Sequence, residues 1–390
     1  MRHFHTFPES ELDRLFYVRP SSFTKDSDKE LLASSLGATI YMPSTRPNLL
    51  SDIRKMLAED ATSVVVCLED AIPDEKLEEG MGNVTALLKK IDALSPEERE
   101  ELPLIFVRPR SPQVLEKLYE DNGVLLQYLT GFTFPKFDSL SGIAFSFTQA
   151  LKEINEAGNL NLYFMPILES PSIIYRESRE TSLNIVLDVL EKNKDSLLAV
   201  RIGATDMSSA YGLRRSSDFT IYDVNVVSSA IADIVNVFGR SEFGALITGA
   251  VWEHFSASPR LLKPQLRASI FPDSDPRMRT RLLRNDYDNL LREIQLDKIN
   301  GITGKTVIHP SHIGLVHSLL VVTHEEYSDA MEILSEGVAG GGAYASIYKN
   351  KMNEVKPHSA WAQKIKNRAD AFGVSNENID YIDFLERFNY

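Results

Sequence analysis

Residues 63–71 read SVVVCLEDA, an apolar run that ends in two adjacent carboxylates, Glu69 and Asp70. Residues 103–110 repeat this layout as PLIFVRPR, in which the apolar run ends in two arginines. A continuous apolar run of this length, bounded by turn residues, is typical of a strand buried on both faces of a parallel sheet. These two segments therefore predict parallel strands with charged side chains at their carboxyl ends.

Six further runs of the same kind occur along the chain and start near Ala38, Phe132, Leu162, Leu197, Phe243 and Thr303. Segments with helical periodicity lie between most of the runs, for example NLLSDIRKMLAED after the first. Eight successive βα units predict an α/β fold, a (β/α)₈ TIM barrel rather than an open doubly wound sheet. Active sites of such barrels lie where the carboxyl ends of the strands meet, and here those ends hold Glu, Asp, Arg and Lys.

Three regions are expected outside the barrel strands and their helices. We predict an N-terminal leader at residues 1–37, a catalytic barrel at 38–324 and a C-terminal helical extension at 325–390. The leader is expected to cover the barrel bottom or to pack on a neighbouring subunit. An insertion between strands seven and eight, residues 256–281, is Pro-rich and basic, which fits a long connection, a lid or an anion-binding rim. Three glycines at 340–342 predict a flexible joint.

The composition excludes several classes of function. Of the 390 residues, 42 are Lys or Arg and 55 are Asp or Glu, so the formal net charge is −13. Such an acidic chain disfavours nucleic acid and anionic membranes as partners. No apolar run is long enough to span a membrane, and the single cysteine, Cys67, excludes an intrachain disulfide. We therefore expect a cytoplasmic protein, with Cys67 as a core residue.

Glu169 and Asp206 end the fifth and sixth predicted strands, so that neighbouring strands would present two carboxylates side by side. Two such carboxylates repel each other unless a proton or a cation lies between them, and oxygen ligands suit Mg²⁺. The alternative is a pair of acids that cap the following helices. Gly203 and Thr205, in RIGATD, are predicted substrate-binding positions, because a glycine lets backbone N–H groups face a substrate carboxylate.

Arg108 ends the third predicted strand and is the candidate for binding a substrate carboxylate or a developing enolate. The alternative is a salt bridge to Glu69 or Asp70, and the two roles are compatible because a neighbouring acid can orient a working arginine. For Lys136 and Lys305 we favour ion pairing over Schiff-base chemistry. His309, which precedes a proline at a predicted helix start, is interpreted as structural.

Taken in order, the segments resemble the HpcH/HpaI aldolase and citrate lyase β-subunit superfamily. The resemblance rests on YMPSTRPNLL, CLEDAIPDEK, FVRPR, FPKFDS, ILESP, IGATDMSSAYG and GITGKTVIHPSHI, which cover roughly residues 38–335. The leader and the insertion are most similar to a divergent branch that is linked to tellurium-resistance gene clusters. The resemblance implies a TIM barrel, a divalent metal, usually Mg²⁺, and a homo-oligomer.

Carried over by position, the resemblance implies that Glu169 and Asp206 are the metal ligands. It makes Arg108 the substrate-binding arginine, supported by the acidic pair Glu69 and Asp70. Arg46 matches a loop position that contacts coenzyme A phosphates in members that use this cofactor. The sequence also departs from the family pattern. Cys67 replaces its first Asp, Pro109 and Arg110 change the pocket floor, and the late segment that carries an acid is matched only by YKNKMNEVKP, with Glu354 offset.

These observations predict a Mg²⁺-dependent carbon–carbon bond lyase or aldolase. Its substrate is expected to be a small 2-oxo or 3-hydroxy acid or the corresponding coenzyme A thioester, with Glu354 or a water carrying the proton. Two alternatives stay open. One is a metal-dependent barrel enzyme acting on phosphoenolpyruvate or pyruvate, which two arginines on the third strand would favour. The other is a non-catalytic barrel module of a stress-resistance operon.

Overall fold

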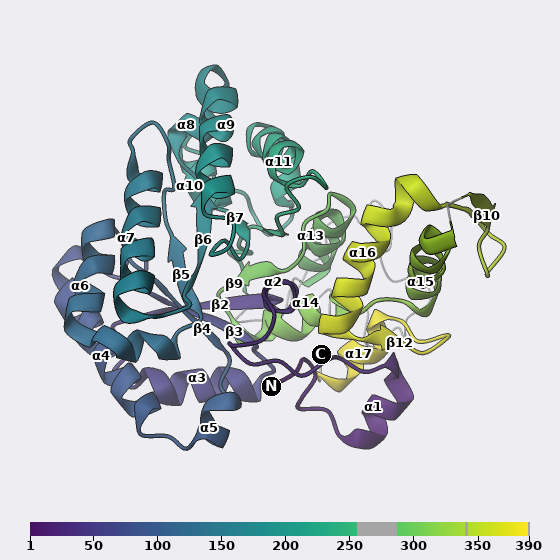
Figure 1. Cartoon of the computed structure of the whole chain (residues 1–390), viewed down its shortest axis with the longest axis horizontal. Helices are drawn as coiled ribbons and strands as arrows, with labels where there is room; N and C mark the ends of the chain where they lie inside the picture. Colours follow the sequence, from purple (N-terminus) through teal and green to yellow (C-terminus); the bar gives the residue numbers. More distant parts are fainter. Residues whose placement is uncertain (256–286, 340–341, 389–390) are drawn as a thin grey trace.

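Eight parallel strands stand in chain order around a central barrel (Figure 1). The computed structural model describes residues 1–255, 287–339 and 342–388. The strands are β2 (Ala38–Pro43), β3 (Ser63–Cys67), β4 (Leu104–Arg108), β5 (Gly131–Phe134), β6 (Tyr163–Leu168), β7 (Val200–Ile202), β8 (Ile247–Thr248) and β9 (Lys305–Val307). All eight predicted strands are therefore confirmed, although β7 and β8 are shorter than their apolar runs.

The ring of strands closes between β8 and β9. The sheet order is β8-β7-β6-β5-β4-β3-β2-β9, and a parallel bridge between Gly249 and Lys305 joins its two ends. Beside this bridge, the N–H of Thr303 donates to the carbonyl oxygen of Ile247 at 2.8 Å. The predicted TIM barrel is thus confirmed, and the eight carboxyl ends lie together at one face.

Helices surround the barrel and bury the outward-facing side of each strand (Figure 1). In β3, Val64, Val65 and Val66 are fully buried, which is why the run has no polar alternation. The surrounding helices are α3 (Leu49–Ala58), α4 (Leu77–Asp92), α5 (Pro96–Glu100), α6 (Pro112–Asn122), α7 (Ile143–Gly158), α8 (Pro171–Ile174), α9 (Arg176–Lys192), α10 (Ala204–Ser209), α11 (Asn225–Phe238), α13 (Tyr287–Ile299) and α14 (Ile313–Leu320).

The leader fills the amino-terminal end of the barrel. It contains α1 (Glu9–Leu15), β1 (Phe16–Val18) and α2 (Lys29–Ser34). Leu32 of α2 packs in one apolar cluster with inward-facing strand residues such as Phe106 and Met165. The bottom of the barrel is therefore plugged by the chain's own leader, as one of the two predictions for this segment proposed.

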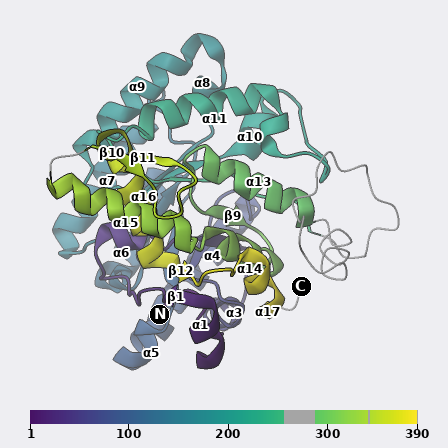
Figure 2. The same cartoon turned by 90° about the vertical axis from the view of Figure 1, so that its right-hand side faces the viewer.

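The C-terminal extension packs against the leader (Figure 2). It comprises α15 (His324–Ala339), β10 (Ala343–Ala345), β11 (Met352–Glu354), α16 (Val355–Phe372), β12 (Val374–Ser375) and α17 (Tyr381–Arg387). β12 pairs antiparallel with β1, and α16 contacts α2. The leader and the extension thus share one surface at the barrel bottom. The domain boundaries predicted at 37/38 and 324/325 stay predictions.

A buried histidine–aspartate latch, consisting of His3, His5, Asp60 and His317, ties the leader to the barrel. The Nδ1 atoms of His5 and His317 lie 3.0 and 3.2 Å from the two Asp60 oxygens. The backbone N–H of Phe4 donates to the same carboxylate at 3.0 Å, and His317 Nε2 accepts from the N–H of Ala38 at 3.1 Å. Because both ring nitrogens of His317 already have partners, the latch is a structural network rather than a metal site.

Lys305 has the ion-pairing role predicted for it. Its fully buried ammonium lies 2.8 Å from both Glu293 and Asp297 of α13, and Arg215 pairs with the same Glu293. These contacts hold β9 against its covering helix.

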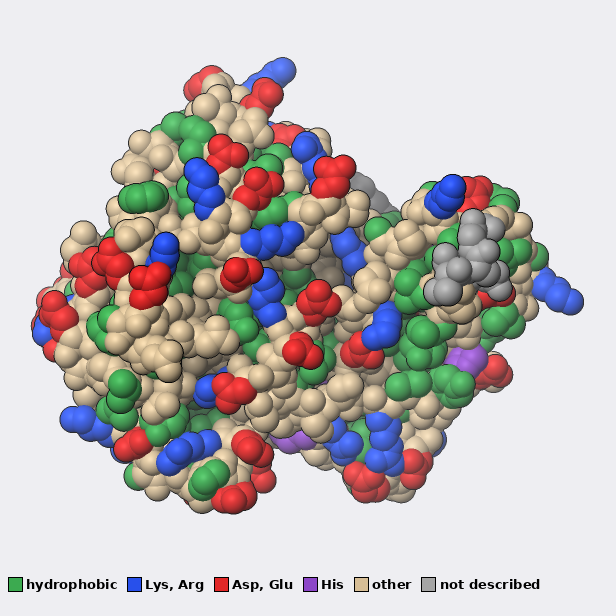
Figure 3. Space-filling view, in the orientation of Figure 1, with side chains coloured by type: hydrophobic (Ala, Val, Ile, Leu, Met, Phe, Trp, Pro, Cys, Tyr) green, Lys and Arg blue, Asp and Glu red, His purple; other side chains and the backbone are tan. Residues whose placement is uncertain are grey.

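Two of the segments singled out in the sequence fall largely outside the described residues. The basic insertion at 256–281 lies there entirely, as do Gly340 and Gly341 of the predicted joint. Among the described helices, none combines the length and the apolar character that crossing a membrane requires. Acidic and basic side chains are interspersed over the described part of the face in Figure 3.

Candidate active site

Arg108 is the centre of a charged cluster at the carboxyl end of the barrel. Its Nη2 lies 2.8 Å from Glu69, 3.4 Å from Asp70 and 3.2 Å from Glu169. Burial opposes the charged form of this guanidinium, but Glu169 and its other neighbours raise the pKa of Arg108 overall. The structure therefore brings four predicted site residues together. The salt bridges predicted for Arg108 are present, and its role in binding substrate stays a prediction.

Lys136 joins the cluster from the loop after β5. Its ammonium pairs with Glu69 and lies 3.2 Å from Asp70, and its backbone has a positive φ of 48°. Burial lowers the pKa of Lys136, but the hydrogen bond to Glu69 outweighs it and raises the pKa to about 12. The ion-pairing role is thus confirmed, and Schiff-base chemistry is disfavoured because it needs a neutral amine.

Glu169 is the most perturbed carboxyl of the cluster. It is only 4% exposed, and its Oε1 accepts from Arg108 and, at 2.8 Å, from the backbone N–H of Lys136. Burial, reinforced by the charge of Asp206, raises the pKa of Glu169 to about 8 despite the opposing effect of Arg108. Burial likewise raises the pKa of Glu69.

Gly203 makes room for Glu169. A Cβ atom at position 203 would stand 2.2 Å from Oε2 of Glu169, so only glycine lets this carboxylate lie against β7. The N–H of Gly203 donates to the carbonyl oxygen of Leu168 at 3.1 Å and so takes part in the sheet. This observation gives Gly203 a positioning role, while the substrate contact predicted for it stays a prediction.

Asp206 lies in the first turn of α10, directly after β7. It is close enough to Glu169 and Lys136 to affect the pKa of each. Within the described part of the chain, no hydrogen bond or ion pair engages its side chain. Thr205 is exposed, and its hydroxyl donates to Glu253 at 2.7 Å, at the rim of the same barrel end.

Three other arginine and glutamate residues of the predicted pocket lie outside the cluster. Arg46 is exposed in the loop after β2, 3.5 Å from Asp52. Arg110 donates to the carbonyl oxygen of Leu68 and pairs with Asp74, so the third strand supplies one arginine to the cluster rather than two. Glu354 lies in the β10–β11 hairpin, where its backbone N–H donates to His358 at 3.0 Å, and no described contact joins it to the cluster.

Two residues that the sequence analysis did not select lie inside the barrel below the cluster. Arg201 of β7 is 2% exposed, and its guanidinium stands 5.7 Å from the ring centre of Tyr41 in β2. The available signal was a single charged residue within an apolar strand, LLAVRIG, which does not by itself show whether the side chain points inward or outward.

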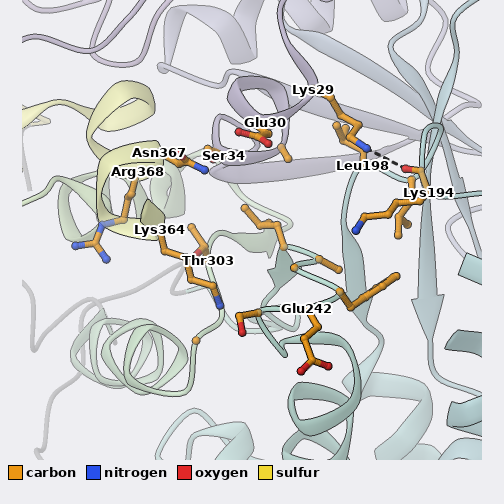
Figure 4. A pocket seen from close by; sticks show the side chains of 18 residues that line it. Lys29, Glu30, Ser34, Lys194, Leu198, Glu242, Thr303, Lys364, Asn367 and Arg368 are labelled. Carbon is orange, nitrogen blue, oxygen red and sulfur yellow. Dashed lines mark hydrogen bonds between the residues drawn. The ribbon is translucent and has the colours of Figure 1, made fainter. Parts of the chain in front are cut away.

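A cavity of about 360 Å³ lies at the opposite end of the barrel (Figure 4). Side chains from α2 and α16 line one part of it, and the segments before β7 and β8 line another. Lys29 donates to the carbonyl oxygen of Lys194 there at 2.9 Å. None of the predicted site residues borders this cavity, so the charged cluster and not the cavity marks the candidate active site.

The charge of the cluster is unbalanced. Glu69, Asp70, Glu169 and Asp206 supply four carboxyl groups, against the two cationic groups of Arg108 and Lys136. Oε2 of Glu169 and the carboxylate of Asp206 have no donor among the described residues. These two are the groups for which the sequence predicts a role as metal ligands, and oxygen atoms of this kind suit a hard divalent cation.

Comparisons with known proteins identify the family and the fold. A family model described as C–C bond lyase of the TIM-barrel fold matches residues 30–374. A citrate lyase from Burkholderia xenovorans LB400 is 14% identical, with a TM-score of 0.60 over 90% of this chain and 96% of that chain. The protein CitE from Mycobacterium tuberculosis, solved with magnesium, acetoacetate and coenzyme A, is 17% identical, with a TM-score of 0.54 over 86% and 99%.

At these identities the two solved structures support the fold alone, and no curated protein matches the sequence. The family model extends across the barrel and into both the leader and the C-terminal extension. The chain therefore belongs to the family of carbon–carbon bond lyases with a TIM-barrel fold.

Proposed function

We propose that this lyase uses Mg²⁺ to cleave or form a carbon–carbon bond in a small 2-oxo or 3-hydroxy acid, free or as a coenzyme A thioester. The observation that carries the proposal is the excess of carboxylates around Arg108. Glu169 and Asp206 each offer oxygen atoms without a donor among the described residues, and Gly203 keeps the space beside Glu169 open.

The residues present fit a divalent cation. Burial disfavours the charged form of Glu169, and a cation beside Oε2 would reverse that preference. Held by Glu169 and Asp206, Mg²⁺ would supply a positive charge that stabilises the oxyanion formed as the carbon–carbon bond breaks. The magnesium in the M. tuberculosis structure supports the same choice of ion.

The basic groups of the cluster are assigned to the substrate. Arg108 and Lys136 already bind carboxylates of the protein, and a substrate carboxylate would share them with Glu69 and Asp70. The two acids would thereby keep Arg108 oriented throughout the reaction. Arg46, at the rim, is assigned to the phosphates of coenzyme A, with Thr205 and Gly203 as the remaining substrate-binding positions.

The role predicted for Glu354 depends on assembly. Because no described contact brings Glu354 to Arg108 within one chain, it could act only from a neighbouring subunit of a homo-oligomer. Mixing an E354Q variant with an R108M variant tests this directly. Recovered activity in the mixture is expected if sites are shared, whereas two variants that remain inactive together contradict sharing.

Calorimetric titration of the metal-stripped protein with Mg²⁺ tests the proposed function, alone and with oxaloacetate or pyruvate present. We expect binding that tightens when the oxo-acid is added and that is lost in Asp206→Asn. Asp13→Asn is the matched control, because Asp13 is an exposed carboxylate bonded to Arg19 on the leader. Absence of Mg²⁺ binding under both conditions would reject the proposal and favour a non-catalytic barrel.

A further inference from the structure

Arg201 is a buried cation without a carboxylate partner in the described part of the chain. Among the described residues its guanidinium hydrogen-bonds to neutral groups, which include Thr306 Oγ1 at 2.5 Å, Thr39 Oγ1 at 3.4 Å and the sulfur of Met165 at 3.7 Å. Taking an uncompensated charge out of water costs several kcal/mol. Fully buried cations elsewhere in the described chain, such as Lys305, are paired with acids, so the isolation of Arg201 calls for a functional explanation.

Tyr41 is the aromatic neighbour of this guanidinium. The two groups form a cation–π contact at 5.7 Å, and the Tyr41 hydroxyl is close enough to Arg201 and to Arg108 to influence both. Tyr41 is therefore a neighbour of the buried Arg201 and lies within electrostatic reach of Arg108, the central arginine of the candidate site.

From its packing and its strand we infer that the accessible part of Tyr41 faces the carboxyl end of the barrel. Its strand, β2, is hydrogen-bonded to β3 on one side and β9 on the other, and its ring packs on the interior apolar cluster that α2 closes from below. Tyr41 is nevertheless partly exposed. The open side is therefore the mouth of the barrel, where Arg108 and Glu169 lie.

The proposed lyase reaction needs a group that moves a proton, and each acid of the cluster among the described residues already has another role. Glu69 and Asp70 are bonded to Arg108 and Lys136, Glu169 and Asp206 are assigned to the cation, and Glu354 is not joined to the site in this chain. A tyrosine hydroxyl both donates and accepts a proton, which suits it to acid–base catalysis.

We propose that Tyr41 is a further catalytic residue, the proton carrier of the reaction, and that Arg201 is the positioning residue that holds and polarises it. This inference rests on the proposed lyase function. During cleavage of a 4-hydroxy-2-oxo acid, one of the 2-oxo acids covered by the proposed function, the bond between C3 and C4 breaks and its electron pair stays with C3. The proton of the 4-hydroxyl moves to the Tyr41 oxygen while the Tyr41 proton moves to C3, which becomes the methyl carbon of pyruvate, and the former O–H pair becomes the new carbonyl bond.

Tyr41 ends this step as it began it, so no oxidant or other reactant is required. Negative charge develops on the phenol oxygen only while the two protons are in transit. Two guanidinium groups fixed beside that oxygen stabilise this charge without any rearrangement, which is the condition for electrostatic catalysis. Burial of Arg201 without an acidic partner therefore serves the reaction and does not stabilise the fold.

The test is the Mg²⁺-dependent exchange of pyruvate methyl protons with D₂O, followed by proton NMR, in the wild type and Tyr41→Phe. We expect the exchange rate at saturating pyruvate to fall at least about 100-fold, the low end for loss of an acid–base group. Mg²⁺ affinity and the thermal midpoint should stay at wild-type values, because phenylalanine keeps the ring. Tyr17→Phe, at an exposed tyrosine of the leader, is the matched control.

Arg201 is tested by the same exchange. Arg201→Met should lower the rate at saturating pyruvate with an unchanged half-saturation concentration, and Arg201→Lys should restore part of it, because lysine keeps the charge. A purely structural arginine would change stability in both variants without this partial recovery.

The outcomes separate this inference from the function on which it rests. Wild-type exchange in Tyr41→Phe, or loss of exchange only in Glu354→Gln, would overturn the role of Tyr41 and leave the lyase proposal standing. A wild-type protein that binds Mg²⁺ but exchanges no proton of pyruvate would overturn the role of Tyr41 and the choice of 2-oxo acids as substrates.

Discussion

Glu169 and Asp60 are two buried carboxyl groups at opposite ends of the same barrel, and their surroundings shift their pKa values in opposite directions. Asp60 is fully buried, yet hydrogen bonds from His317 and His5 outweigh its burial and hold its pKa well below the usual range. Glu169 is almost as buried, but its donors reach only Oε1, and its pKa rises to about 8.

The difference shows that the supply of donors, more than burial, sets the charge of an interior acid. At Asp60, His317 and the N–H of Phe4 donate to one oxygen and His5 lies 3.0 Å from the other, so the carboxylate is a structural anion that holds the leader to the barrel. At Glu169, Oε2 has no donor among the described residues, so the group is prepared for a positive charge beside that oxygen. The arrangement at Glu169 indicates a functional site, and the arrangement at Asp60 indicates a structural contact.

Replacement of Glu169 by glutamine should have the largest effect on Mg²⁺ binding. Gln keeps an acceptor for Arg108 and Lys136 but removes the charge, so Mg²⁺ affinity should fall at least about 100-fold, roughly 2.7 kcal/mol. The free energy of unfolding without metal should stay level or rise, because a desolvated acid is lost. Calorimetry and urea denaturation measure the two quantities. Unchanged affinity would remove Glu169 from the metal site.

Replacement of Asp60 by asparagine should lower the stability of the fold without affecting Mg²⁺ binding. It breaks the latch and leaves two histidines without their anion, so the free energy of unfolding should fall by about 3 kcal/mol, as for a buried pair that loses one partner. Mg²⁺ affinity of the folded protein should not change. Equal losses of stability in Asp60→Asn and in the exposed control Asp13→Asn would show that the latch is unimportant.

The pH dependence separates the two acids without a mutation. Because the folded pKa of Glu169 is about 8, well above its unfolded value near 4.3, the native state keeps this proton between those pH values. Its contribution to stability is therefore complete at low pH and declines as pH rises toward 8. The contribution of Asp60 has the opposite sign: it is complete above the unfolded pKa and is lost only under strong acid.

A cation on Glu169 must displace the retained proton. We therefore expect Mg²⁺ to bind about tenfold more tightly per pH unit from pH 6 to 8, with close to one proton released per ion. Titrations in two buffers of different ionisation enthalpy count that proton. The same experiment on Glu169→Gln should show neither the proton nor the slope, and a wild-type affinity independent of pH would contradict the assignment.

The smallest expected change comes from Gly203→Ala. The added Cβ would press on Oε2 of Glu169, so Mg²⁺ affinity should fall by about tenfold, roughly 1.4 kcal/mol, with little change in the latch. Gly82→Ala is the control: it lies in α4 with no atom near the added Cβ, and it should stabilise the helix by about 0.5–1 kcal/mol. Equal Mg²⁺ affinity in Gly203→Ala and Gly82→Ala would show that the backbone of β7 shifts to accommodate the added Cβ.

Much of the fold could be predicted because each buried strand of a TIM barrel is a continuous apolar run with a charged end. SVVVCLEDA and LYFMPILES met this condition, and the order of strands then placed Glu69, Arg108 and Glu169 at one face. The boundaries of β7 and β8 were less clear, because apolar residues continue into loops that the barrel also buries.

The side-chain contacts could not be predicted in the same way. That Arg108 binds three acids while Arg110 turns to Asp74 depends on which side of the strand each residue faces. The latch joins His3 to residues 60 and 317, a distance in sequence that no local pattern encodes. His309 was predicted to be structural, and it does cap its short helix by accepting from the N–H of Ser311.

The pairing of β1 with β12 also sets the order in which the molecule can be completed. Asn376 donates to the carbonyl oxygens of Asp13 and Arg14, more than 360 residues earlier in the chain. Contacts at such separation form slowly, and during synthesis they must wait for β12 to leave the ribosome. The latch can hold the leader once His317 has been made, whereas the pairing of β1 with β12 can form only later. The lower end of the barrel therefore gains its last cover only after all of the barrel strands have been synthesised.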